Sequence, residues 1–325
     1  MWRAMLSLRR FHRTPCAGPA AVLVLMGCLA VPSMALAQKV FSSPAQASGA
    51  LFTAAQHNDE QAMLDILGPD GRKLVSSGDA TEDADDRANF VRRYQEMSRL
   101  VKEPDGTTTL YVGARNWPMP IPLVGSGTSW HFDTAAAKKE ILYRRVGQNE
   151  LSTIRVCQEL AAAEKEYDSV QGGHYADKFF SDEGRHDGLY WKATAGQPQS
   201  PIGPLVAAAA AQGYVHHPGT PTPYHGYYYR ILTGQGKSAP GGEKSYLVDG
   251  KMTGGFAFLA YPAQYRSSGV TSFLVSADGA VYETDLGRDT ATIAKAMQEY
   301  DPDSSWHKSE AAPATAAASS RATVH

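Results

Sequence analysis

The stretch Gly255–Asp285, GFAFLAYPAQYRSSGVTSFLVSADGAVYETD, decides the fold of the C-terminal half of this chain. It contains three short apolar and aromatic runs separated by Gly- and Ser-containing segments, at 256–261, 271–276 and 281–285. Asp278-Gly279 lies between the last two runs and is typical of a tight hairpin turn. The upstream run 227–232, YYYRIL, has the same character. The pattern predicts an antiparallel sheet of about four strands.

Helical periodicity precedes this sheet. Asp133 can cap a helix over 134–146, and Gly147 and Asn149 indicate a break before a longer helix over 149–170. A Gly-, Pro- and aromatic-rich region follows, with one short helix near 204–212. A final helix is predicted from Asp289 to Tyr300, because apolar residues recur there every three to four positions.

In the N-terminal half, the spacing of apolar residues changes once, from a helical period to the alternation of strands. Apolar residues at helical spacing predict three helices, over 44–55, 59–67 and 86–101. Alternating residues then predict three strands, over 107–113, 121–124 and 130–132. Helices followed by an antiparallel meander indicate an α+β unit with helices on one sheet face. The sequence therefore predicts an α+β protein with domains at 41–147 and 148–306 and a disordered Ala- and Ser-rich tail at 307–325.

The N-terminus predicts export. Residues 1–37 contain four arginines and no acidic residue, and the apolar run Ala20–Val31 precedes a small-x-small site that ends at Ala37. These are the parts of a cleavable signal peptide, and the run is too short to cross a bilayer. We expect cleavage after Ala37 and a periplasmic protein with no transmembrane segment. A lipoprotein beginning at Cys28 and twin-arginine export through Arg9-Arg10 are the alternatives.

Composition excludes several classes of protein. The chain has 325 residues, of which 43% are hydrophobic and 20% charged, as in ordinary globular proteins. Removing residues 1–37 lowers Lys+Arg from 31 to 27 against 33 Asp+Glu, which leaves a net charge near −6. This charge argues against nucleic acid as a partner. Cys157 is then the single cysteine, and its place on an apolar helix face predicts a buried small hydrophobe.

Several runs resemble one bacterial exported family. The runs are FSSP (41–44), LDILGPDGRKLVSSG (64–78), NWPMPIPLV (116–124), WHFDT (130–134), GLYW (188–191), YHGYYYRIL (224–232), GGFAFLAYPAQY (254–265) and DPDSSW (301–306). Together they resemble the family known as domain of unknown function 2950, over about residues 41–306. The resemblance implies an exported protein and supplies no catalytic residues.

A second resemblance concerns the C-terminal unit. One long helix, a Tyr-rich loop and strands ending in a D-G hairpin resemble the globular head of type IV pilins and pseudopilins. The pilin membrane-embedded helix and its cleavage motif are absent from this sequence. The N-terminal unit resembles a cone-like fold of the nuclear-transport-factor type.

The sequence contains no catalytic constellation. His174, His186, His216, His217 and His225 concentrate in the loop-rich region without the spacing of a metal site. Nucleophile elbows and phosphate-binding loops are also missing, so we predict no cofactor, no metal and no catalytic residue. The sequence favours a non-catalytic protein over an enzyme.

Consecutive aromatic residues give the best candidate for a binding surface. Alternation places Tyr227 and Tyr229 on one face of a strand and Tyr228 on the other, with Arg230 next to them. We therefore predict a partner surface at Tyr227, Tyr228, Tyr229 and Arg230. The favoured function is an envelope accessory or adaptor protein that contacts another envelope protein. The alternatives are an envelope hydrolase and a glycan-binding module that use the Tyr- and His-rich loops.

Overall fold

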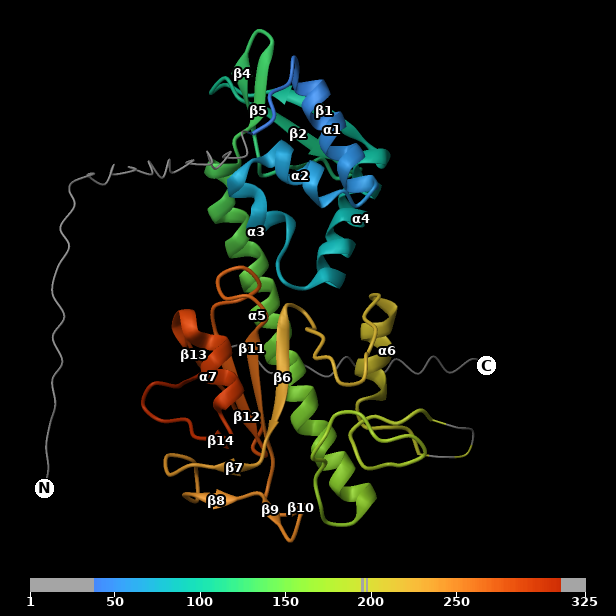
Figure 1. The fold of residues 1–325 in the computed structure, drawn as a ribbon, viewed down its shortest axis with the longest axis vertical. Coiled ribbons are helices and arrows are strands. Elements are labelled where there is room, and N and C mark those ends of the chain that lie inside the picture. Colours follow the sequence, from blue (N-terminus) through green and yellow to red (C-terminus); the bar gives the residue numbers. More distant parts are fainter. Residues whose placement is uncertain (1–37, 194–195, 197, 311–325) are drawn as a thin grey trace, which may run out of the picture. The chain divides into compact units, whose positions relative to one another are not determined.

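The computed structural model describes residues 38–310 except 194, 195 and 197 (Figure 1). The predicted signal peptide and residues 311–325 of the predicted tail lie outside the described residues. Helix α1 (Pro44–Gln56) begins where the Ser43 hydroxyl accepts a hydrogen bond from the Gln46 amide, with proline at its first position. Helix α2 (Glu60–Leu67) is capped in the same way by Asp59, and it ends at Gly68.

Helix α4 (Ala80–Glu96) differs from its predicted bounds of 86–101. It follows the short turn η1 (Pro69–Gly71) and helix α3 (Arg72–Val75). It begins early because the Asp79 carboxylate caps it, accepting hydrogen bonds from the amides of Thr81 and Glu82. It ends early because residues 98–102 form strand β1, a strand that periodicity did not reveal.

The first sheet is an antiparallel meander. Its strands are β1 (Ser98–Lys102), β2 (Thr108–Val112), β3 (Trp117–Pro118), β4 (Leu123–Ser126) and β5 (Ser129–Phe132). The order is β1-β2-β4-β5, and β3 also pairs with β2. One core forms between this sheet and the helices, and it contains Ala47, Leu51, Ile66, Leu123 and Phe132. The expected unit of helices plus meander is therefore present.

Helix α5 (Thr134–Gln171) is continuous over 38 residues, so the predicted break at Gly147 and Asn149 is wrong. A single glycine costs a helix only about 1 kcal/mol, and Asn149 is buried and hydrogen-bonded. Ala137 belongs to the first core, and Ile154, Cys157 and Leu160 belong to a second. The proposed domain boundary falls inside α5, and the division into two domains stays a prediction.

The second sheet is antiparallel, as predicted. Its strands are β6 (Tyr227–Leu232), β11 (Ala257–Pro262), β12 (Ser272–Ser276), β13 (Val281–Thr284) and β15 (His307–Lys308), in the order β15-β13-β12-β11-β6. Strand β15 consists of residues that the sequence placed at the start of the tail. It pairs with β13 through Tyr282 and Glu283. The described chain is thus α+β, in agreement with the sequence.

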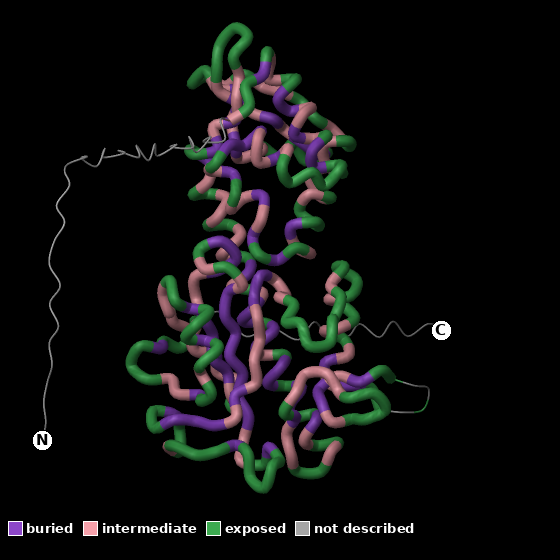
Figure 2. Tube along the Cα trace, viewed as in Figure 1, coloured by how far each residue is buried: buried purple, intermediate pink, exposed green. Residues whose placement is uncertain are grey.

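Helices cover both faces of this sheet (Figure 1). Helix α5 contacts β11 and β12, while α7 (Thr290–Ala296) contacts β11. Strands β11 and β12 are accordingly buried along nearly their whole length (Figure 2). The final helix is shorter than predicted, because Tyr300 lies in a short strand, β14 (Glu299–Tyr300), that runs parallel to β7 (Gly234–Gln235).

The remaining elements are short. Helix α6 (Gly203–Ala211) interrupts the loop-rich region, and η2 (Gly287–Asp289) precedes α7. Strand β8 (Lys244–Ser245) pairs with β7, and β9 (Leu247–Val248) forms a hairpin with β10 (Lys251–Met252). In residues 38–310, no helix is long and apolar enough to cross a membrane.

Candidate functional site

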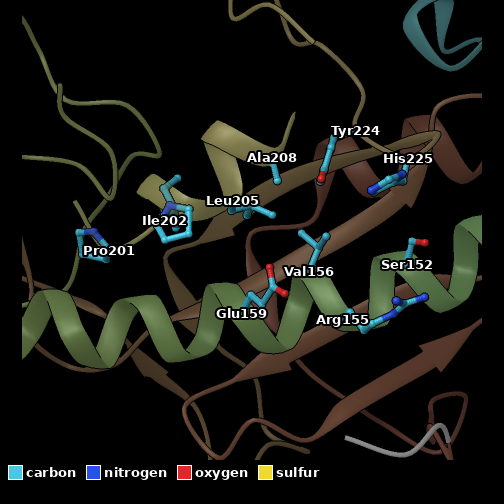
Figure 3. Close-up of a pocket in the computed structure, with 11 residues that line it drawn as sticks. Ser152, Arg155, Val156, Glu159, Pro201, Ile202, Leu205, Ala208, Tyr224 and His225 are labelled. Carbon is cyan, nitrogen blue, oxygen red and sulfur yellow. The ribbon is translucent and has the colours of Figure 1, made fainter. Parts of the chain in front are cut away.

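A cleft of about 430 Å³ lies between α5, α6 and the segment before β6 (Figure 3). We call it the α5–α6 cleft. Eleven residues line it: Ser152, Arg155, Val156, Glu159, Pro201, Ile202, Pro204, Leu205, Ala208, Tyr224 and His225. Its volume falls in the range of small-molecule and peptide side-chain pockets.

The floor of the cleft is apolar. Val156 and Ile202 are buried in the second core, and Leu205 packs partly against it. Helix α6 therefore uses its first turn to reach the core, and it leaves Pro204 and Ala208 exposed at the cleft. This arrangement offers a surface for an apolar group of a ligand.

Two opposite charges lie on the α5 side of the cleft. Arg155 and Glu159 are four residues apart, so they lie one above the other on the same helix face. Burial raises the pKa of Glu159, and the Arg155 guanidinium opposes that rise. Both side chains are largely exposed, and Arg155 Nε donates to the Leu151 carbonyl at 3.3 Å. A ligand in this cleft would therefore meet a positive charge at Arg155 and a negative charge one helical turn away at Glu159.

The opposite wall is a tight turn, Tyr224–Tyr227. The backbones of Tyr224 and Tyr227 exchange two hydrogen bonds, of 2.8 and 3.2 Å. The two central residues both have positive φ, 50° at His225 and 72° at Gly226, as in a type I′ turn. The turn places the Tyr224 and His225 rings 4.1 Å apart between centroids. Burial lowers the pKa of His225, which favours the neutral imidazole.

Asp79 holds this turn in place through hydrogen bonds. Its Oδ2 accepts a hydrogen bond from the Tyr214 hydroxyl at 2.9 Å and another from the Gly226 amide at 3.0 Å. The Tyr214 hydroxyl in turn accepts a hydrogen bond from the His225 amide at 3.2 Å. Asp79 is 1% exposed, so these bonds are shielded from water. The cap of helix α4 thus also positions the cleft wall.

Among the described residues, the polar side chains of the cleft are not joined to one another as a catalytic pair would be. In the described part of the chain, no hydrogen bond joins His225 to a carboxylate or to the Ser152 hydroxyl, as a nucleophile–base pair would need. Within the same residues, no group of three or more His, Cys, Asp and Glu side chains is arranged to hold a metal ion. The other loop histidines do not converge on this cleft: His216 stacks on Phe180 and His186 stacks on Trp191.

The aromatic strand mainly serves the packing of its own sheet. Tyr227 is fully buried, and its hydroxyl donates to the Thr271 carbonyl at 2.9 Å. Tyr229 faces α5 and its hydroxyl donates to the Thr153 hydroxyl at 3.4 Å. Tyr227 therefore cannot contribute to a surface in this conformation.

Tyr228 and Arg230 face the opposite side of the sheet. Tyr228 packs on Tyr261, with 5.6 Å between ring centroids. The Arg230 guanidinium donates to the carbonyls of Ala294 and Met297 and so binds the end of α7. Both side chains are half-buried, and the partner surface predicted there stays a prediction.

Sequence reasoning missed most of the cleft. Arg155 and Glu159 have the four-residue spacing of a shared helix face, which was a usable signal. Nothing in the sequence placed residues 201–208 beside them. Cys157 is buried as predicted, and burial raises the pKa of its thiol to about 12, so it supplies no nucleophile to the cleft.

The structure is that of an α+β protein with a small, largely apolar cleft between α5 and α6. The model of one family, described as protein of unknown function (DUF2950), matches residues 38–309. The chain belongs to this family. No curated protein and no solved structure matches it.

Proposed function

We propose that this protein is a non-catalytic accessory protein of the bacterial cell envelope, and that the α5–α6 cleft binds a peptide segment of a partner protein. The observation that carries the proposal is the composition of the cleft. An apolar floor between Val156 and Leu205 lies beside an exposed cation and an exposed anion, Arg155 and Glu159. A peptide can place an apolar side chain on that floor and opposite charges along α5.

Two features of the sequence support the cellular setting. The signal-peptide pattern at 1–37 favours a periplasmic location, with the mature chain beginning at Gln38. The resemblance of the C-terminal unit to pilin heads favours a role in protein contacts.

Site-specific photocrosslinking tests the proposal. Ala207 and Ala208 are neighbouring exposed residues of α6, but Ala208 lines the cleft and Ala207 does not. With a photoreactive residue at position 208 in growing cells, we expect one discrete adduct, absent when the probe is at 207. Arg155→Glu should abolish that adduct, because it replaces the cation with a second anion. Equal adducts at both positions, or an adduct insensitive to Arg155→Glu, would exclude the cleft as the binding site.

A glycan ligand is the second candidate. The Tyr224 and His225 rings form a small aromatic wall on which a sugar ring can pack. Purified cell-wall sacculi provide the test, because a glycan-binding protein co-sediments with them. Co-sedimentation that is lost in Tyr224→Ala and retained in Arg155→Glu would favour the glycan over the peptide.

A further inference from the structure

Four carboxylates gather at the start of α4, on the side of that helix nearest the cleft wall. We call Asp79, Glu82, Asp83 and Asp86 the acidic cluster. Asp79 and Asp83 are buried, with 1% and 6% of their surface exposed. Asp83 accepts two hydrogen bonds from the Ser77 amide, at 2.9 and 3.1 Å. Asp79 and Asp83 are therefore held by backbone amides, whereas Glu82 is half-buried and Asp86 is exposed.

Glu82 joins this cluster to α5. Asn149 Nδ2 donates to Glu82 Oε2 at 3.3 Å and to the Ser268 carbonyl at 3.0 Å. Asn149 is 1% exposed and packs tightly on the turn of the cleft wall, since a Cβ built on Gly226 would lie 2.5 Å from its Nδ2. Gly226 is thus held on one side by Asp79 and on the other by Asn149.

We propose that the acidic cluster positions the cleft wall, and that ionisation of Glu82 loosens this wall. The proposal concerns how the cleft of the proposed function is regulated, and it stands on two routes, the first made of hydrogen bonds and the second ending in the packing of Asn149 against Gly226. One runs from Asp79 to Tyr214 and the amides of His225 and Gly226, and the other runs from Glu82 through Asn149.

The charged groups around Glu82 determine the direction of the effect. The pKa of Glu82 is raised to about 7; burial is the largest cause, and the neighbouring carboxylates Asp79 and Asp86 contribute to the rise. From α5, the Arg145 guanidinium lowers it, but that group also donates to the carbonyls of Lys73 and Leu74. The Asn149 hydrogen bond lowers it least.

The remaining neighbours do not supply a compensating cation to Glu82. Tyr214 is a neutral hydroxyl whose pKa burial and Asp79 raise strongly, and burial lowers the pKa of His225, which favours its neutral form. Arg87 acts on Asp83 and Asp86. Ionised Glu82 therefore places a negative charge beside the carboxyl groups of Asp79 and Asp86, which oppose it.

The linkage between protonation of Glu82 and closure of the cleft wall gives the sign and the size of the pH effect. A carboxyl whose pKa is raised in the closed arrangement favours that arrangement while it is protonated, and this advantage is lost as pH rises from 4.5 through about 7. If opening returns Glu82 to its ordinary pKa of 4.5, opening becomes at most about tenfold more frequent between pH 6 and pH 8.

Hydrogen exchange of the mature protein tests this without any ligand. After correction for intrinsic rates, we expect the amides of residues 214–227 to lose up to about tenfold in protection between pH 6 and pH 8. Glu82→Gln, which is neutral and of the same shape, should keep the pH 6 protection at pH 8. Glu96→Gln, an exposed residue of the same helix, should behave like the wild type.

A second variant tests the positioning route separately. Tyr214→Phe removes only a hydroxyl, so the protein should fold, and the amides of His225 and Gly226 should exchange faster at both pH values. A pH response that persists in Glu82→Gln, or unchanged exchange in Tyr214→Phe, would overturn the proposal. Because exchange is read without a partner, failure of the crosslinking experiment at Ala208 leaves this result intact.

Discussion

Replacing Glu164 with Gln should make the protein more stable at alkaline pH and leave it nearly unchanged at acid pH. Glu164 lies on α5 with none of its surface exposed. Its Oε2 accepts a hydrogen bond from the Ala176 amide at 2.9 Å, while Oε1 has no hydrogen-bond partner. Burial raises its pKa to about 8, and the carboxylates of Asp177 and Asp168 contribute to that rise. The folded protein therefore holds this residue as a neutral acid at neutral pH.

The magnitude follows from linkage. A folded-state pKa near 8 against an ordinary 4.5 destabilises the folded state progressively as pH rises from 4.5 to 8. The full difference corresponds to at most about 5 kcal/mol. Glutamine cannot ionise, so the variant escapes this loss and still offers an amide oxygen to the Ala176 amide. Even 2 kcal/mol would move the melting temperature of a domain of this size by roughly 4–8 °C.

Circular dichroism melting at pH 5, 7 and 9 measures the effect. We expect the difference in melting temperature between Glu164→Gln and wild type to grow from pH 5 to pH 9. Glu166→Gln is the matched control, because Glu166 is exposed on the same helix and should show a constant small difference. A Glu164→Gln difference that is equal at all three pH values would refute the reasoning.

Three other predictions can be checked directly. Tyr227→Ala should lower the free energy of unfolding by about 3–5 kcal/mol, because it leaves a cavity in the core. Tyr228 is only half-buried against Tyr261, so Tyr228→Ala should cost about 1–2 kcal/mol. Equal losses of the two variants in urea unfolding would contradict this assignment. Gly226→Ala should lower the melting temperature by several degrees, since its φ of 72° and the nearby Asn149 both oppose a side chain; a wild-type melting temperature would show that the turn relaxes freely. Intact mass of periplasmic material should correspond to a chain beginning at Gln38, and a lipid-modified Cys28 start would disprove the predicted cleavage.

Local pattern predicted the long strands of the second sheet well and the ends of α4 and α5 poorly. The runs 227–232 and 271–276 were visible because buried strands are short, apolar and bounded by turn residues. Helix α5 was divided wrongly because Gly147 and Asn149 are typical of a helix end, whereas the buried Asn149 here donates hydrogen bonds to Glu82 and Ser268. Those partners are 67 and 119 residues away in sequence, so no local signal contains them.

The cleft could not be predicted either, because its residues are distant from one another in sequence. Its residues come from 152–159, 201–208 and 224–225, and only folding brings these segments together. The sequence did single out the aromatic run at 224–229, of which Tyr224 and His225 line the cleft. Its role could not be assigned, because alternation gives the two faces of a strand without saying that α5 and α7 cover both.

In the turn at Tyr224–Tyr227, the backbone of His225 sets the path of the chain and its imidazole ring lines the cleft. Position 225 has a positive φ, which favours glycine, asparagine, aspartate and histidine. Its imidazole is not needed for that geometry, since the backbone amide makes the contact with Tyr214. Related sequences should therefore exchange histidine for asparagine at 225 without altering the path of the chain. Such an exchange would leave the path of the chain intact while replacing the ring that lines the α5–α6 cleft, so position 225 can change the chemistry of the cleft wall without changing the fold.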